Sequence, residues 1–175
     1  MSVREHFKTL TYDKNYQDIE CIGFHGYSKS HVSWANMKDA VDWKDKVVCD
    51  LGCFHAYFSI KVIQAGAKKV FALDRSITVL ETASMIIGES VFSRSKKIMT
   101  RIWNDGDAVP KCNLILCLNV LHHFDDMDKA LSEMKATTIF EINNSDLESV
   151  LKYFNILSTL PSHRENRNIY VCERK

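Results

Sequence analysis

The sequence predicts a doubly wound α/β fold, in which a mostly parallel sheet carries helices on both of its faces. Short apolar runs that are rich in β-branched residues alternate with segments whose apolar residues recur every three or four positions. Two strand-like runs follow each other directly at the end of the chain, which adds one antiparallel strand. We expect a single domain over residues 1–175, with an N-terminal arm over 1–27 and the α/β core over 28–175.

Composition narrows the class of protein further. The chain is 46% hydrophobic, which suits a packed core, and its net charge of +1 argues against a strongly basic surface but leaves room for a local patch. No apolar run approaches about 20 residues and the N-terminus lacks an apolar signal region, so we expect no membrane span and a cytoplasmic protein. Six cysteines form no CxxC pair, and Cys49, Cys53 and His55 are too loosely spaced for zinc, so we expect reduced thiols and no metal.

The expected elements follow from this alternation. Gly88 is expected to end the second core helix, and Ser145 with Glu148 is expected to form a capping box for the last one. The expected strands are 46–51, 69–73, 97–103, 113–118, 137–142, 155–160 and 168–172. The expected helices are 28–41, 55–65, 76–87, 125–134 and 145–154.

Residues 46–59, KVVCDLGCFHAYFS, are the stretch around which a binding site is expected. A buried strand ends in a turn at Gly52 and a helix follows, which brings free backbone N–H groups to one place. Ligands of open α/β sheets bind beyond the carboxyl ends of the strands, and an acidic residue after the second strand, here Asp74, can accept both hydroxyls of a ribose. The stretches expected at that edge are 50–53, 74–75, 104–105, 119–123 and 141–143.

These stretches resemble the motifs of class I S-adenosylmethionine (SAM) dependent methyltransferases over about residues 28–173. DLGCFHAYFS stands at the D-x-G-x-G-x-G loop, FALDRS at the ribose-binding acid, and ILCLNVLHHFDD at the fourth-strand motif. The resemblance implies seven strands in the order 3-2-1-4-5-7-6, with the last strand antiparallel. Gly52 is the one loop glycine that remains, since Phe54 and Ala56 occupy the other two positions. Phe54 fits the loop if its φ is negative and otherwise crowds the methionine end of the cofactor.

The resemblance also implies residue roles toward SAM and its product S-adenosylhomocysteine (SAH). The methionine end of SAM is expected to lie near Asp50, Gly52, Cys53 and Phe54, and the sulfonium above Asn119 and Val120. The ribose is expected to bind Asp74. The adenine is expected to lie beside Arg75, with its amino group at Asn104 or Asp105. His122 or His123 is expected to act as a base if the acceptor holds a proton at neutral pH.

The acceptor stays open at this point, as RNA or a small molecule. A second resemblance, to enzymes that methylate oxidised wobble uridines of tRNA, rests on HGYSKSHVSW and on AYFS. The connections at the sheet edge are short, so the acceptor pocket is expected to be shallow or open, which favours a large acceptor, a partner subunit or closure by the arm. One alternative is a degenerate SAM-binding subunit, which is favoured by Phe54 at a glycine position of the loop. The other is a nicotinamide oxidoreductase, which the missing G-x-G-x-x-G spacing disfavours.

Overall fold

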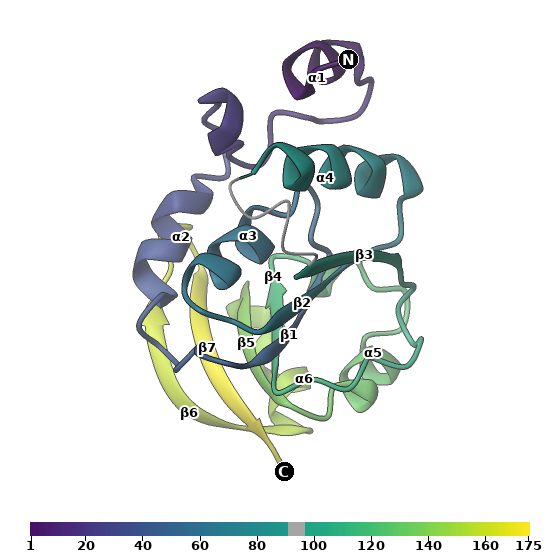
Figure 1. Ribbon diagram of the computed structural model, residues 1–175. Helices are drawn as coiled ribbons and strands as arrows, with labels where there is room; N and C mark the ends of the chain where they lie inside the picture. The colour runs from purple at the N-terminus through teal and green to yellow at the C-terminus, as the bar shows by residue number, and fades with distance from the viewer. Residues whose placement is uncertain (91–96) are drawn as a thin grey trace.

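A computed structural model describes residues 1–90 and 97–175, and the described chain builds one seven-stranded sheet (Figure 1). The strand order is β3-β2-β1-β4-β5-β7-β6, and β7 runs antiparallel to both of its neighbours while the other pairs are parallel. The strands are β1 (Val47–Leu51), β2 (Lys69–Asp74), β3 (Ile98–Ile102), β4 (Leu114–Leu118), β5 (Thr137–Asn143), β6 (Phe154–Pro161) and β7 (Arg167–Arg174). The predicted fold class and strand order are confirmed.

The two faces of the sheet bury different side chains of the same strands. In β1, Val48 packs under the helices of one face while Cys49 and Leu51 pack on the other, as the alternation of a strand requires. The helices α2 (Ser30–Met37), α3 (Tyr57–Gln64) and α4 (Ile77–Glu89) cover the first face, and α5 (Met127–Glu133) and α6 (Leu147–Leu151) cover the second. Because both faces are covered, the strands are apolar on both sides.

Several predicted helix boundaries are wrong, and local geometry explains each difference. The helix expected from residue 55 begins at Tyr57, because Ala56 adopts a left-handed conformation with φ of +62°. The helix expected to stop at Gly88 continues through it to Glu89. The Ser145–Glu148 capping box does not form, since the short 3-10 helix η4 (Asn144–Asp146) precedes α6 and no side chain caps it.

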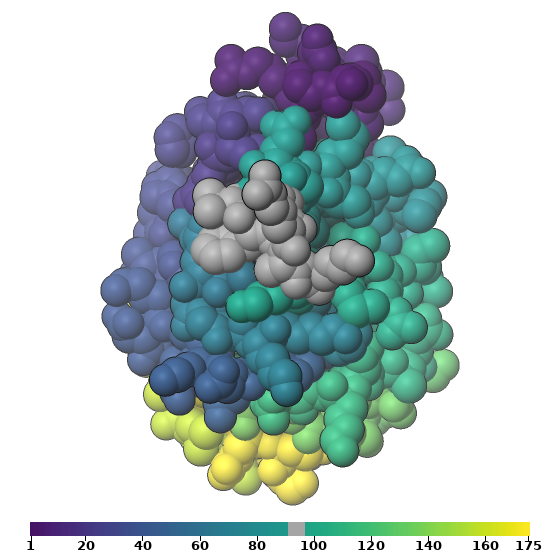
Figure 2. All heavy atoms as spheres, viewed as in Figure 1, coloured from purple at the N-terminus to yellow at the C-terminus, as the bar shows by residue number. Residues whose placement is uncertain are grey.

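The first 29 residues pack against α3 and along α4 as far as its last residue, Glu89 (Figures 1 and 2). They contain α1 (Val3–Thr9), which packs on α4, and the short helix η1 (Glu20–Ile22). Gln17 is buried, and its side-chain oxygen accepts from the backbone of His55 at 3.1 Å, directly beside the turn after β1. Burial lowers the pKa of His55 to about 4, so its ring stays neutral and hydrogen-bonds Tyr12 Oη at 2.9 Å. The arm is therefore bonded to the loop that carries the candidate site.

None of the helices in the described ranges has the length and apolarity that crossing a membrane requires.

Candidate active site

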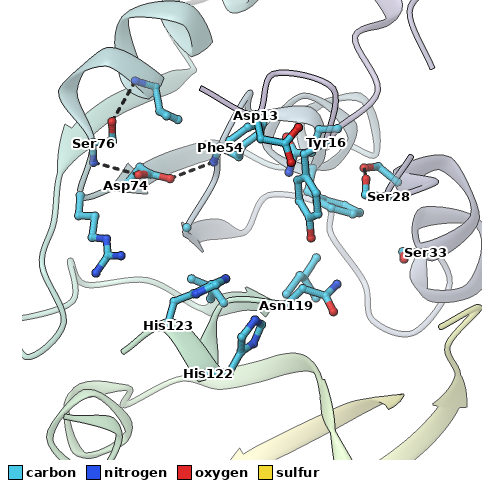
Figure 3. A pocket seen from close by; sticks show the side chains of 18 of the residues that line it. Asp13, Tyr16, Ser28, Ser33, Phe54, Asp74, Ser76, Asn119, His122 and His123 are labelled. Atoms are coloured by element: carbon cyan, nitrogen blue, oxygen red, sulfur yellow. Dashed lines mark hydrogen bonds between the residues drawn. The ribbon is translucent and has the colours of Figure 1, made fainter. Parts of the chain in front are cut away.

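A pocket of about 530 Å³ opens beyond the carboxyl ends of β1, β2 and β4 (Figure 3). The N-terminal arm and the β6–β7 loop form its other walls, through Asp13, Tyr16, Tyr27 and Arg164. The sequence-predicted residues that line it are Gly52, Phe54, Asp74, Arg75, Asp105, Asn119, Val120, His122 and His123. Most of the predicted residues are thus brought to one cavity.

The loop after β1 keeps a glycine-type backbone at three alternate positions. Gly52, Phe54 and Ala56 have φ values of +67°, +50° and +62°, all in the left-handed region. The φ of Phe54 is therefore positive, so the condition under which Phe54 was expected to fit the loop without crowding the cofactor is not met. Each non-glycine residue here carries a backbone cost of roughly 1–2 kcal/mol. The ring of Phe54 meets Tyr16 edge-on, with centroids 5.5 Å apart, and lies 4.1 Å from the His55 ring, so aromatic packing offsets that cost.

Asp74 ties the end of β2 to this loop. Its Oδ2 accepts from the backbone N–H of Phe54 at 3.2 Å, and its Oδ1 accepts from Ser76 at 3.0 Å, the two bonds drawn in Figure 3. A carboxylate offers about four acceptor positions, so each oxygen of Asp74 retains capacity for a ligand hydroxyl. The carboxylate also lines the pocket, which makes it suitable for binding a vicinal diol.

Three predicted residues lie outside the pocket. Asp50 is in phase with Val48 and so faces α3, where its Oδ2 accepts from Ser59 Oγ at 2.6 Å. Cys53 is buried and packs in a cluster beneath α4. Asn104 turns away toward Asp107, whose carboxylate accepts from the Asn104 backbone at 2.9 Å.

Asp105 lies in the chain segment that joins β3 to β4, and it also lines the pocket. Its Oδ2 accepts from the backbone N–H groups of Asp125 at 2.6 Å and of Asp126 at 3.3 Å. Partial burial acts to raise the pKa of Asp105, but these backbone hydrogen bonds outweigh it and lower the pKa. Asp105 is therefore ionised at neutral pH and fixed in place.

The floor of the pocket rests on a buried carboxylate. Asn119 has φ of +57°, and its amide nitrogen donates to Glu141, which is fully buried. Ser162 Oγ also donates to Glu141, at 2.6 Å. Glu141 accepts from the amide nitrogen of Asn119, so the amide oxygen of Asn119 is free to accept from Arg167. Arg167 also lines the pocket.

His122 and His123 leave β4 on the short helix η3 (Leu121–His123), and both rings are exposed at the pocket. Partial burial lowers the pKa of His122, and the neighbouring His123 and Arg167 lower it further. A neutral His122 ring can accept a proton at pH 7, as a general base must.

Sequence reasoning left closure by the N-terminal arm open as one possibility, but it did not name the arm residues Asp13, Tyr16 and Gln17. Tyr16, Gln17 and Asp13 line the pocket although they precede the first motif by more than thirty positions. The aromatic residues of the arm are their only sequence signal.

Asp18, His25 and His31 bring three ligand-type atoms within 4.8 Å of one another. Asp18 accepts from the backbone N–H groups of Gly26 and His31, so the group is accounted for by closure of the loop before α2.

Comparison with known proteins identifies the class of this chain. A family model described as a methyltransferase domain matches residues 42–174. The chain therefore belongs to the methyltransferase domain family. The predicted class, a SAM-dependent methyltransferase of the class I fold with SAM as cofactor, is confirmed, and the acceptor is not specified by the match.

Curated relatives include tRNA U34 carboxymethyltransferases. The protein of that name from Campylobacter fetus subsp. fetus is 29% identical over 109 residues, which is 62% of this chain and 38% of the relative. The one from Helicobacter pylori strain G27 is 31% identical over 98 residues, 54% of this chain and 37% of the relative. The chain thus spans well under half the length of the curated relatives that it matches.

Solved structures share the fold. Magnesium protoporphyrin IX methyltransferase from Synechocystis PCC 6803 with bound SAM superposes with a TM-score of 0.67 and 22% identity, covering 83% of this chain and 77% of that chain. A SAM-dependent methyltransferase structure from Listeria monocytogenes gives a TM-score of 0.66 at 16% identity, covering 84% of this chain and 100% of that one. At these identities the likeness concerns the fold.

Proposed function

We propose that this domain transfers a methyl group from SAM to a uridine base of RNA, with tRNA as the substrate class. The observation that carries the proposal is one continuous pocket whose cofactor side holds Asp74 and Asp105 and whose open side holds Arg164 and Arg167. The names of the curated relatives support tRNA as the acceptor. Free thiols at all six cysteines suit the reducing cytoplasm, where we place the protein.

The residues of the pocket fit SAM. A Cβ atom at Gly52 would lie 2.4 Å from Val120 Cγ2, so the absence of a side chain there keeps the cofactor floor open. Asp74 offers spare acceptor capacity for the ribose hydroxyls, and Asp105 offers a fixed carboxylate for the adenine amino group. Arg75 is exposed beside Asp74 and can flank the adenine ring.

The other residues of the pocket position the two reactants or accept a proton. SAM supplies an activated methyl group on a sulfonium, so the protein mainly orients the two reactants. Asn119 and Val120 form the floor of the pocket, and Glu141 fixes the Asn119 amide. His122, neutral at pH 7, is placed to accept a proton from the acceptor if the reacting atom carries one.

The printed names of the relatives favour a second candidate, transfer of a carboxymethyl group from a sulfonium donor that carries this group in place of the methyl group of SAM. Arg167 lines the pocket and is held by Asn119, so its guanidinium can pair with a carboxylate carried by the transferred group. Parallel reactions with SAM and with the carboxymethyl sulfonium donor, followed by the mass of the modified nucleoside, distinguish the two candidates.

The proposal is tested by incubating the protein with SAM and two preparations of bulk bacterial tRNA, one that lacks wobble modification and one that carries an oxidised wobble uridine. We expect a modified uridine in the nuclease digest by mass spectrometry, and micromolar binding of SAH by calorimetry. Binding of SAH without modification of any tRNA would overturn the enzyme proposal and favour a degenerate SAM-binding subunit.

Replacing Asp74 by asparagine is expected to raise the dissociation constant of SAH at least tenfold, about 1.4 kcal/mol. An amide has one acceptor oxygen in place of two, so the variant must give up the backbone bond to Phe54 or the one to Ser76, and it loses acceptor capacity for the ribose hydroxyls. Calorimetry measures the effect, and Asp39→Asn is the matched control because the Asp39 side chain is 85% exposed and away from the pocket. Equal SAH affinity in wild type and Asp74→Asn would contradict the assigned role.

A further inference from the structure

Tyr27 is an exposed aromatic side chain at the rim of the pocket. Its relative exposure is 62%, and it is the one aromatic residue among the large exposed apolar side chains of the described ranges. Tyrosine combines a large apolar ring with a polar hydroxyl, and such residues are enriched at binding interfaces.

The ring is exposed and yet fixed. Its hydroxyl donates to the Asp13 carboxylate, and its backbone N–H donates to Asn15 O at 3.0 Å. The ring of Tyr16 meets it edge-on, with centroids 5.6 Å apart and planes at 78°. A packing role for Tyr27 would bury its face, whereas this arrangement supports the ring from its edge and its hydroxyl and leaves most of its surface to solvent.

A cation stands beside this aromatic pair. The Arg164 guanidinium lies over the Tyr16 ring, 5.4 Å from its centroid, and its Nη2 donates to Tyr16 Oη at 3.1 Å. Within the described residues, the ion pairs of the structure include neither Arg164 nor Arg167. The positive charge at this rim is therefore held in place by aromatic and neutral groups and is not neutralised by a carboxylate.

We propose that Tyr27 and Arg164 form the subsite for an unpaired segment of the RNA acceptor, in which a base next to the reacting one stacks on Tyr27 and its phosphate pairs with Arg164. Single-stranded nucleic acids are bound by such combinations of aromatic faces and uncompensated cations. A fixed ring suits stacking because little side-chain freedom is lost when the base binds. This inference rests on the proposed function and adds to it the residues that recognise the acceptor.

The inference is tested on the full chain with a fluorescently labelled stem–loop RNA whose loop contains unmodified uridine. Anisotropy in the presence of SAH gives the RNA dissociation constant. Tyr27→Leu, which keeps an apolar side chain without a π face, is expected to weaken RNA binding about tenfold. Tyr27→Phe keeps the ring and is expected to stay within about threefold of wild type. Both variants are expected to bind SAH as wild type does, which shows that they are folded.

Arg164→Gln tests the electrostatic part of the proposal. It is expected to weaken RNA binding and to lower the slope of log affinity against log salt by about 0.7, as loss of one single-strand phosphate contact does. Arg101→Gln, on the exposed edge strand β3 and outside the pocket, is the matched control and should leave the slope unchanged.

The outcomes separate this inference from the function on which it rests. Wild-type protein that binds and modifies RNA, with Tyr27→Leu binding equally well, would overturn the subsite and leave the function standing. Wild-type protein that binds SAH but no RNA would overturn both the RNA acceptor and the subsite.

Discussion

Replacing Asp50 by asparagine is expected to stabilise the domain at about pH 8 by up to about 4 kcal/mol. Asp50 is 2% exposed beneath α3, and burial raises the pKa of its carboxyl to about 7, although the Ser59 hydroxyl bond opposes the rise. An unfolded aspartate has a pKa of about 3.9, and each pH unit of difference corresponds to about 1.36 kcal/mol. Asparagine keeps an acceptor for Ser59 and removes the charge.

The sign of the pH dependence follows from the raised pKa of Asp50. Between about pH 4 and pH 7 the folded protein retains a proton that the unfolded chain has lost, so the contribution of Asp50 to stability falls as the pH rises through this window. The asparagine variant lacks that loss, so its advantage should grow with pH and level off above about pH 7. Urea unfolding of both proteins across the range measures the difference.

Asp39→Asn serves as the control for this series, because it makes the same substitution at a side chain that is 85% exposed. His55 does not disturb the comparison, since its lowered pKa acts equally in both proteins. A free-energy difference between Asp50→Asn and wild type that stays constant with pH would contradict the buried, proton-binding carboxyl.

Gly52→Ala is expected to lower the free energy of unfolding by about 2–4 kcal/mol and to weaken SAH binding. The residue has φ of +67°, and its new Cβ would lie 2.4 Å from Val120 Cγ2 and 2.9 Å from Val120 Cβ. Valine is branched at Cβ and has few rotamers, so the contact cannot be relieved by moving a flexible side-chain end. Denaturant unfolding with an unchanged m-value measures the loss.

A second substitution separates the two causes of this loss. Val120→Ala in the Gly52→Ala background removes the clash but not the left-handed backbone, so we expect partial recovery of stability. Gly88→Ala is the matched glycine control, because Gly88 lies within α4 with no atom within 4 Å of the added Cβ, and helix propensity there favours alanine by about 0.5–1 kcal/mol. Wild-type stability in Gly52→Ala would show that the loop does not require glycine.

The fold was predictable because it depends on patterns that each strand and helix carries locally. The run 114–118 is buried at every position, and its sequence is apolar throughout. Helix ends were less predictable, since the start of α3 depends on the dihedral angle of Ala56, a residue whose type gives no sign of it. Ser145 and Glu148 have the right spacing for a cap, but the chain there forms a 3-10 turn first.

The candidate site also has parts that were predictable from the sequence and parts that were not. Asp74 and Asn119 follow predicted strands, and parallel strands end at one edge, so their meeting follows from topology. Asp50 was misplaced although its phase with Val48 assigns it to the face under α3. Contacts such as Arg167 with Asn119, 48 positions apart, and Gln17 with His55, 38 positions apart, join segments that share no periodic pattern.

The turn after β1 keeps its left-handed backbone at three positions, although only one of these positions is a glycine. A lineage can replace its glycines singly, each at a cost of roughly 1–2 kcal/mol, while the strand end and the helix start keep their positions. Every such replacement also adds a side chain, and at position 54 that side chain has become a wall against which the N-terminal segment rests. Because the Phe54 side chain contacts Tyr12 and Tyr16, substitutions in the N-terminal arm and in this turn are expected to be coupled in their effects on stability.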